Sequence, residues 1–444
     1  MHDIGVLGGG ISGLFTAYFL GGDVEVLEAD ETPGGLARCF GGEGFISDIG
    51  GHILFSKDKE PLAHELAVLE GNLRLGLRAN KILYKGLHVK YPFENGIDVL
   101  PKEEIVEILH SFVDNPHKEK PTNFREWMFH VFGDGLTNKY MLPYNEKIWK
   151  TPPEQMSLEW VDRVPRPPLL DLIKTAVGIQ TEGYTHQLNF HYPEKGGFEA
   201  LPRAVAAKLG KKITTGFRVA KCHQVDGGWA VVSDKGEERR YRKLIATIPI
   251  TTLFAALGDV PAEVSSVANA LRYNSLRVVL IGVRATNLPA YTALYVPDPG
   301  SLAHRICYNQ VFSPNNVPEG CSSVSCEITV PPGGDLDKWT DEKVRDRVVD
   351  DLTRDGVIDP KTVCYSKVHR ERFAYVVYDL GYSDRVKVIK DFTVARGIHL
   401  AGRFAEYQYV NTDACVRRAL NLSRELRGGD IAPEARIPEA WKTW

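Results

Sequence analysis

The chain has 444 residues, of which 43% are hydrophobic, and a formal net charge of -3. This length exceeds one compact core, so we expect two or three domains. The balanced charge indicates neither a nucleic acid partner nor binding to an anionic membrane surface. Apolar runs are short, so no membrane span is expected.

The cysteines and the N-terminal residues give an expectation for the cellular compartment of the protein. The seven cysteines are scattered, with no C-x-x-C pair and no histidine cluster at zinc spacing. This usage favours reduced thiols and predicts no metal site. The first predicted strand begins at Ile4, which leaves no room for a signal peptide. We therefore expect a soluble, cytoplasmic enzyme.

The first forty residues carry the pattern of a dinucleotide-binding unit. Ile4–Leu7 is predicted to be a buried strand and Ser12–Leu20 a helix. The turn between them matches G-x-G-x-x-G, which lets the backbone approach a pyrophosphate at a helix N-terminus. A second strand ends at Glu28, where a carboxylate can bind the ribose of an adenosine. The cofactor-binding candidates in this unit are Gly8, Gly10, Ser12, Gly13 and Glu28.

The segment after Glu28 indicates which dinucleotide binds. A glycine doublet followed by an arginine resembles the corresponding segment of the large FAD family that includes amine oxidases. This resemblance implies FAD as the cofactor. It adds Gly35, Leu36 and Arg38 to the candidate cofactor contacts, with Val219 expected beside the adenine.

Two later segments are expected to meet the flavin. Two adjacent glycines after a strand permit close approach to a flat ring, and a histidine follows them. Near the C-terminus, a Gly-Arg pair follows the last buried strand, and the next helix would turn its positive end toward the N1/O2 edge of the flavin. Either Asn411 or Thr412 is expected to cap that helix. The candidates are Gly50, Gly51, His52, Gly402, Arg403, Thr412 and Asp413.

The predicted fold class is α/β. We expect a Rossmann-like FAD-binding domain of glutathione-reductase type, an inserted helical domain, and a substrate domain built on a mixed or antiparallel β-sheet. The FAD-binding domain is predicted to be discontinuous, over residues 1–75, 190–265 and 390–444. The helical domain is assigned to residues 101–189, and the β-sheet domain to residues 76–100 and 266–389. Within the latter, strands are expected at 277–283, 293–296, 306–311, 323–329 and 362–368, and a helix at 341–354.

Several separated motifs occur together in one order. They are Gly51-His52-Ile53-Leu54-Phe55, Tyr91-Pro92-Phe93, Pro143-Tyr144-Asn145 with Trp149, and Gly402-Arg403-Phe404 with Tyr409. Together they resemble the UDP-galactopyranose mutase family, most closely its eukaryotic branch, over nearly the whole chain. The resemblance implies an isomerase that interconverts pyranose and furanose forms of a nucleotide-diphosphate sugar. In that family N5 of reduced FAD attacks the anomeric carbon, without net redox.

The resemblance also implies roles for individual residues. Arg305 and Arg403 match the arginines that grip the pyrophosphate, and guanidinium forks suit that bidentate task. Tyr295, Tyr375 and Tyr409 match the tyrosines that complete the phosphate site, and His52 matches the position facing flavin N5. The implied uridine wall comprises Phe55, Tyr91, Phe93, Tyr144, Asn145, Trp149 and Arg163.

The chain departs from the family pattern near the base. Glu94 stands where the eukaryotic branch has a glutamine, and an ionised carboxylate only accepts hydrogen bonds. The base, like the sugar, is therefore left open, and Glu94→Gln is expected to favour UDP over other nucleoside diphosphates. Val376 replaces a proline after the matched tyrosine.

Two other functions remain open. One is an FAD oxidase or dehydrogenase of the amine-oxidase type, and the other is a flavin-bearing homologue without catalysis. The reductant, NAD(P)H or another, and the oligomeric state are not indicated by the sequence.

Overall fold

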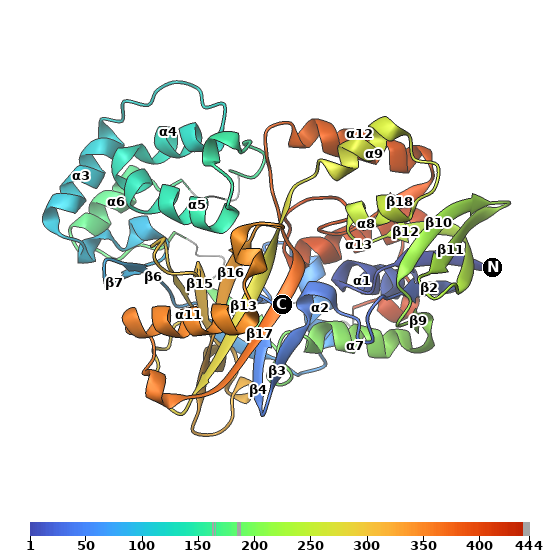
Figure 1. Ribbon diagram of the computed structural model, residues 1–444, viewed down its shortest axis with the longest axis horizontal. Coiled ribbons are helices and arrows are strands. Elements are labelled where there is room, and N and C mark those ends of the chain that lie inside the picture. The colour runs from blue at the N-terminus through green and yellow to red at the C-terminus, as the bar shows by residue number, and fades with distance from the viewer. Residues whose placement is uncertain (162–163, 165, 184–187, 438–444) are drawn as a thin grey trace.

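The computed structural model describes residues 1–161, 164, 166–183 and 188–437. Two large sheets organise it, with a group of helices, α3 to α6, set apart beside the second sheet (Figure 1). The α/β fold class is confirmed, and the division into three domains stays a prediction. The helices not introduced below are α3 (Lys102–Val113), α4 (Phe124–Leu136), α5 (Leu142–Trp149) and α6 (Leu169–Ala176).

The first sheet has seven strands. Its parallel part joins the N-terminal strand to partners from far along the chain, because β1 pairs with both β2 and β12. In spatial order the strands are β10 (Val219–Val225), β11 (Gly228–Ser233), β12 (Glu238–Ala246), β1 (His2–Leu7), β2 (Val24–Leu27) and β9 (Ile213–Thr214), with β18 (Ile398–Leu400) also on β12.

Helices cover both faces of this sheet because its strand residues alternate between two cores. Val6 and Val26 face one core, which receives α1 (Ile11–Leu20), α7 (Ala200–Leu209) and α13 (Thr412–Arg427). Leu7 and Leu27 face the other, which receives α8 (Ile250–Ala256), α9 (Ala262–Asn269) and α12 (Tyr382–Ala395). Such two-sided cover is the arrangement expected of a parallel sheet.

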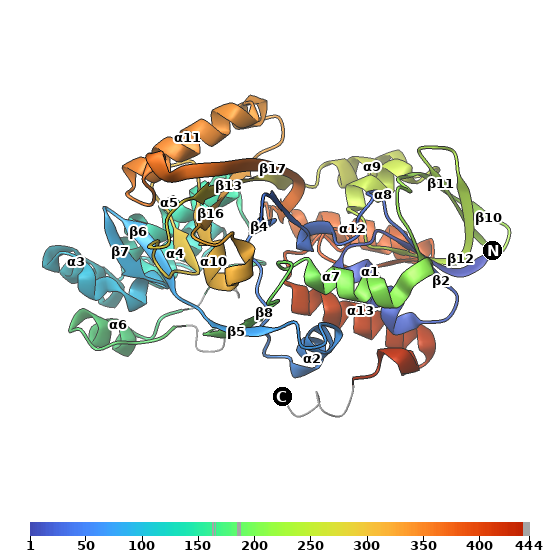
Figure 2. The same cartoon turned by 90° about the horizontal axis from the view of Figure 1, so that it is seen from below.

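The second sheet also has seven strands and is mostly antiparallel. Its order is β17 (Val363–Val376), β13 (Tyr273–Val283), β16 (Ser322–Val330), β15 (Arg305–Tyr308), β14 (Ala293–Tyr295), β6 (Asn80–Tyr84) and β7 (Leu87–Lys90). Helix α11 (Asp341–Arg354) lies over β13 and β17 (Figure 2). Within residues 76–100, β6 and β7 form a hairpin that joins this sheet, since β6 pairs with β14.

Short elements join the two sheets. Two small ribbons are formed by β3 (Cys39–Gly42) with β4 (Phe45–Asp48), and by β5 (Arg74–Leu77) with β8 (Asn189–Tyr192). Helix α2 (Lys59–Val68) packs against α13 and α7.

Some predicted strand bounds are wrong. The strand expected over 306–311 ends at Tyr308, and α10 (Asn309–Phe312) follows. There the Asn309 side chain donates to the hydroxyls of Ser323 and Ser325, at 2.9 and 2.8 Å, which favours a turn of the chain over continued pairing. The strand expected to begin at 362 runs on to Val376, because β13 pairs with it along its length.

Candidate functional site

The glycine turn between β1 and α1 is closed by direct backbone packing. A Cβ added at Gly13 would lie 1.9 Å from the Gly8 carbonyl oxygen, so only glycine fits there. Gly8 itself has φ of +103°, a conformation that favours glycine. The turn therefore brings the N-terminus of α1 to the surface of a cavity, where its free N–H groups can bind a phosphate.

Glu28 stands at the end of β2, beside this turn. Its Oε2 accepts the Gly9 N–H at 2.7 Å and its Oε1 accepts the Asp30 N–H at 2.9 Å. Each carboxylate oxygen has a second lone pair, so both can still accept from ribose hydroxyls. The geometry thus fits the predicted ribose contact.

A cavity of about 840 Å³ extends from this turn to the second sheet. Of the predicted cofactor contacts, Gly13 and Gly402 do not line it. Gly402 packs against the turn instead, because a Cβ there would lie 2.5 Å from the Ser12 Oγ. The predicted contacts that do line it are Gly8, Gly10, Ser12, Glu28, Gly35, Leu36, Arg38, Gly50, Gly51, His52, Val219, Arg403, Thr412 and Asp413.

The predicted flavin-facing segment is tightly packed. Gly51 lies against β15, where an added Cβ would be 3.1 Å from the Cys307 Sγ. His52 stacks on Phe198 with ring centroids 4.8 Å apart, and its Nδ1 lies 2.9 Å from the Gly50 carbonyl oxygen. Burial lowers the pKa of His52 to about 4, so the ring is neutral at physiological pH. Its Nδ1 then carries the proton and donates to Gly50.

Arg305, one of the two predicted pyrophosphate ligands, already has an anionic partner. Its Nε and Nη2 donate to the two carboxylate oxygens of Glu327, at 2.8 and 2.7 Å. Burial disfavours the charge of each group, but their mutual attraction raises the pKa of Arg305 and lowers that of Glu327. The pair is therefore ionised, and the carboxylate largely offsets the charge of the arginine.

Glu327 also connects this pair to the flavin segment and to a predicted tyrosine. Its Oε1 accepts the Gly51 N–H at 2.9 Å, and its Oε2 lies 3.5 Å from the Tyr375 hydroxyl. That hydroxyl is also 3.4 Å from Nε2 of His304, a residue only 1% exposed. Burial lowers the pKa of His304 to about 3, so it stays neutral and adds no charge to the pair.

Arg403 differs from Arg305 in its partners. Its Nη2 donates to the Ala374 carbonyl, and its guanidinium lies 4.0 Å from the Tyr409 ring centroid. Tyr409 in turn stacks with Tyr375 at 5.8 Å. Across the described parts of the chain, no carboxylate oxygen lies within 4.0 Å of the Arg403 nitrogens, and its buried Nε has no hydrogen-bond partner. Arg403 thus presents an uncompensated positive charge at the cavity.

The predicted base wall is only partly at the cavity. Phe55 lines it, and so do all the predicted phosphate-site residues, including Tyr295. Tyr91 and Tyr144 lie behind Tyr295, with ring centroids 4.6 and 5.6 Å from it. Three other members, Phe93, Asn145 and Trp149, are buried and do not line the cavity, and Arg163 lies outside the described residues. Glu94, predicted near the base, is also buried and does not line the cavity.

Burial affects Asn145 and Glu94 in different ways. Asn145 donates to the Met141 carbonyl at 2.7 Å and accepts from the Trp149 indole at 3.2 Å, so its amide is engaged within the helices. Burial raises the pKa of Glu94 to about 7. Near neutral pH the acid form is therefore populated, and it donates as well as accepts. The expectation of an acceptor-only side chain needs this correction.

The sequence-based prediction missed Glu327, His304 and Glu65. Glu327 lies in β16, a strand whose nine residues are all buried. A single carboxylate in such a run was the available signal, since buried acids require a partner. Glu65 is fully buried on α2 and lines the cavity. Nothing in the local pattern of α2 distinguishes it.

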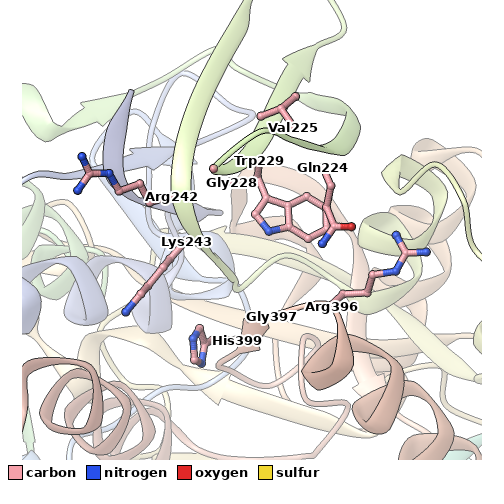
Figure 3. A pocket seen from close by; sticks show the side chains of 10 residues that line it. Gln224, Val225, Gly228, Trp229, Arg242, Lys243, Arg396, Gly397 and His399 are labelled. Atoms are coloured by element: carbon pink, nitrogen blue, oxygen red, sulfur yellow. The ribbon is translucent and has the colours of Figure 1, made fainter.

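A second hollow of about 550 Å³ opens beside the β10–β11 hairpin (Figure 3). Arg242, Lys243 and Arg396 line it, and Trp229 is buried at its wall. Arg242 pairs with Asp3 at 3.2 Å. None of its lining residues belongs to the large cavity, so this hollow is separate from the predicted site.

Within the described residues, no group of three or more His, Cys, Asp or Glu side chains is placed to hold a metal ion. All seven cysteines are free thiols. The described helices include none with the length and apolar character needed to cross a bilayer.

The model of the flavin containing amine oxidoreductases matches residues 11–427 of the chain. The chain belongs to this family. Membership in the family, the glycine turn and the lined cavity agree, and FAD is the cofactor. The residues around the cavity fit it, because the N-terminus of α1 and the Glu28 carboxylate line the cavity where a pyrophosphate and a ribose can bind.

Solved structures of other flavin enzymes share the fold. One described as reduced UDP-galactopyranose mutase has a TM-score of 0.88 and 26% identity, over 96% of each chain. A protein of Exiguobacterium sp. 255-15 named as a candidate protoporphyrinogen oxidase has a TM-score of 0.75 and 20% identity, over 96% of this chain and 98% of that one. Cyclohexylamine oxidase of Brevibacterium oxydans has a TM-score of 0.65 and 15% identity, over 96% and 99%.

These comparisons confirm the predicted resemblance to UDP-galactopyranose mutase. The assignment to its eukaryotic branch stays a prediction. At identities of 20% and below, the similarity to the oxidases shows the fold alone.

Proposed function

We propose that the protein is a flavin-dependent mutase that interconverts pyranose and furanose forms of a nucleotide-diphosphate sugar, with UDP-galactose as the first substrate to test. The observation that carries the proposal is the similarity to reduced UDP-galactopyranose mutase over 96% of both chains. The cluster of Arg403, Tyr375 and Tyr409 at the cavity supports it.

Arg403 suits the binding of a diphosphate. Its positive charge has no carboxylate partner among the described side chains, and Tyr375 and Tyr409 place two phenol groups beside it. A guanidinium donates to phosphate oxygens in a fixed fork, and tyrosine hydroxyls donate single hydrogen bonds. In this role Arg403 holds the diphosphate both before the sugar bond breaks and after it, which keeps the leaving group in place.

Arg305 has a different task, because Glu327 offsets its charge. The ion pair holds the Arg305 guanidinium 3.6 Å from a Cβ built on Gly51, so the side chain lies against the flavin-facing backbone. We assign it to shaping the cavity near Gly51, with its remaining donor capacity directed to a substrate oxygen. The neutral His52 adjoins the same backbone and adds no charge that would repel a sugar cation.

Reduced FAD, when bound, supplies a nucleophilic nitrogen for the anomeric carbon. The protein residues orient the sugar toward it, exclude water through the buried aromatic rings behind Tyr295, and stabilise charge on the diphosphate. No net electron transfer to the substrate is required.

The alternative is an oxidase or dehydrogenase of the amine-oxidase type, favoured by the family and by the fold shared with amine oxidases. The cavity disfavours a cationic amine, because the uncompensated Arg403 would repel it. An oxidase predicts flavin reduction by its substrate and release of peroxide, whereas a mutase predicts neither.

The test begins with protein reduced by dithionite without air and incubated separately with UDP-galactopyranose and UDP-galactofuranose. Chromatographic interconversion that requires the reduced flavin supports the mutase. UDP binding without turnover points to a different sugar. Neither turnover nor nucleotide binding, with bleaching of the flavin by an amine, supports the oxidase.

A further inference from the structure

Glu65 is a fully buried acid at the wall of the flavin cavity. It lies in α2, the helix that packs against α13, and it is 0% exposed. The cavity that it lines is also lined by Ser12, in the first turn of α1, and by Asp413, in the first turn of α13. Glu65 therefore lines the same cavity as the N-terminal ends of two helices.

Neither carboxyl oxygen of Glu65 has a hydrogen-bond partner in the described protein. An unpaired buried polar group costs about 1–3 kcal/mol, and buried polar groups are nearly always paired. The other acid on α2, Glu60, does not share this state, because Arg417 and Arg424 bind it. Since none of the residues that the structure describes pairs with Glu65, a bound molecule is the expected source of its partner.

The charge state of Glu65 defines that partner. Burial, with a smaller contribution from the carboxylate of Asp413, raises its pKa well above the ordinary value. The two nearby arginines of α13, Arg417 and Arg424, are already neutralised by Asp58 and Glu60. Burial therefore favours the uncharged acid of Glu65, which has one O–H to donate. The partner that suits this O–H is an oxygen that accepts a hydrogen bond, and an anionic oxygen accepts most strongly.

FAD carries such oxygens in its pyrophosphate and in its ribityl chain. We propose that Glu65, as the neutral acid, donates a hydrogen bond to an oxygen of FAD and so anchors the middle of the cofactor. Ser12 and Asp413 mark the region, because a dinucleotide pyrophosphate binds at the N-terminus of the first helix. An anionic phosphate oxygen would favour the acid form further. The inference holds whichever reaction the flavin performs.

The test measures FAD binding to the apoprotein by quenching of flavin fluorescence. Glu65→Leu removes the donor and is expected to weaken FAD binding at least tenfold. Glu65→Gln keeps an N–H donor of similar length and is expected to stay within threefold of the unchanged protein. Binding of FAD to Glu65→Leu within threefold overturns the proposal, and so does an equal loss in both variants.

Thermal melting of the apoproteins separates this role from a structural one. Since Glu65 has no partner among the described residues, Glu65→Leu is expected to leave the apoprotein melting temperature unchanged or higher. Glu199 is the matched control, a buried acid whose oxygens accept from Cys39 and Arg203 at 2.8 and 2.7 Å, so Glu199→Leu is expected to lower it. A Glu65→Leu apoprotein that melts as low as Glu199→Leu contradicts the proposal.

Binding of ADP-ribose locates the acceptor. This ligand has the pyrophosphate but no ribityl chain. If Glu65→Leu weakens ADP-ribose and FAD equally, the acceptor is a phosphate oxygen. If only FAD binding weakens, the acceptor is a ribityl hydroxyl. Either result supports the proposal.

Discussion

Replacing Arg305 with methionine is expected to destabilise the protein through Glu327. The change leaves the Glu327 carboxylate, which is 1% exposed, without the guanidinium that now contacts both of its oxygens. Breaking a buried ion pair on one side costs about 3–5 kcal/mol. An unfolding entropy of about 2.1 cal/mol/K per residue gives this chain roughly 0.9 kcal/mol/K, so the melting temperature should fall by about 3–5 °C.

The dependence on pH follows from the direction of the Glu327 pKa. In the unchanged protein this pKa is lowered, so the pair stabilises the fold above the unfolded pKa and the stabilisation is lost as pH falls. Without Arg305, burial raises the folded pKa of Glu327 instead, and stability is lost as pH rises through it. The difference in melting temperature between the two proteins should therefore be larger at pH 8 than at pH 5.

A double variant provides the control. Arg305→Met with Glu327→Met replaces the whole pair by apolar side chains and is expected to recover most of the lost melting temperature, because no buried charge remains unpaired. The assay is differential scanning fluorimetry of the apoproteins at both pH values. A double variant less stable than Arg305→Met, or a difference independent of pH, would refute the reasoning.

Three further changes test the site. Arg403→Ala should weaken UDP binding by about 1.5–3 kcal/mol in calorimetry, as for hydrogen bonds to a charged group, whereas Arg396→Ala at the separate hollow should leave it unchanged. Glu94→Gln should stabilise the protein more at pH 8 than at pH 5, because a folded pKa near 7 means that stability is lost as pH rises; equal melting shifts at both pH values would contradict this. Gly13→Ala should abolish FAD binding, since its Cβ would meet the Gly8 carbonyl at 1.9 Å; a purified variant with bound flavin would disprove the close packing.

The sequence-based prediction of the cofactor side rests on local signals, and most of its residues line one cavity. The glycine turn and Glu28 follow β1 and β2, neighbouring parallel strands whose ends lie together, and the Gly50-Gly51 pair follows β4 of an antiparallel ribbon. Arg403 was predicted through the motif that carries it. In each case a short segment contains the whole physical reason.

The partners across the sheets could not be predicted in this way. Glu327 reaches Gly51 and Arg305 only because β16 and β15 pair within the second sheet and the segment after β4 packs against it. The offset of the Arg305 charge is therefore a property of the fold, not of either segment. The burial of Asn145 and Trp149, two members of the predicted base wall, has the same origin, since the packing of α5 against its neighbours buries both side chains away from the cavity.

The central claim is the interconversion of a nucleotide-sugar between its two ring forms. The most direct measurement follows UDP-galactofuranose under reduced and oxidised flavin in parallel, with separation of the isomers by chromatography. The account predicts formation of UDP-galactopyranose with reduced flavin, at least a hundredfold faster than with oxidised flavin, and no peroxide. Absence of interconversion in both states, together with peroxide release and flavin reduction by an amine, would contradict it.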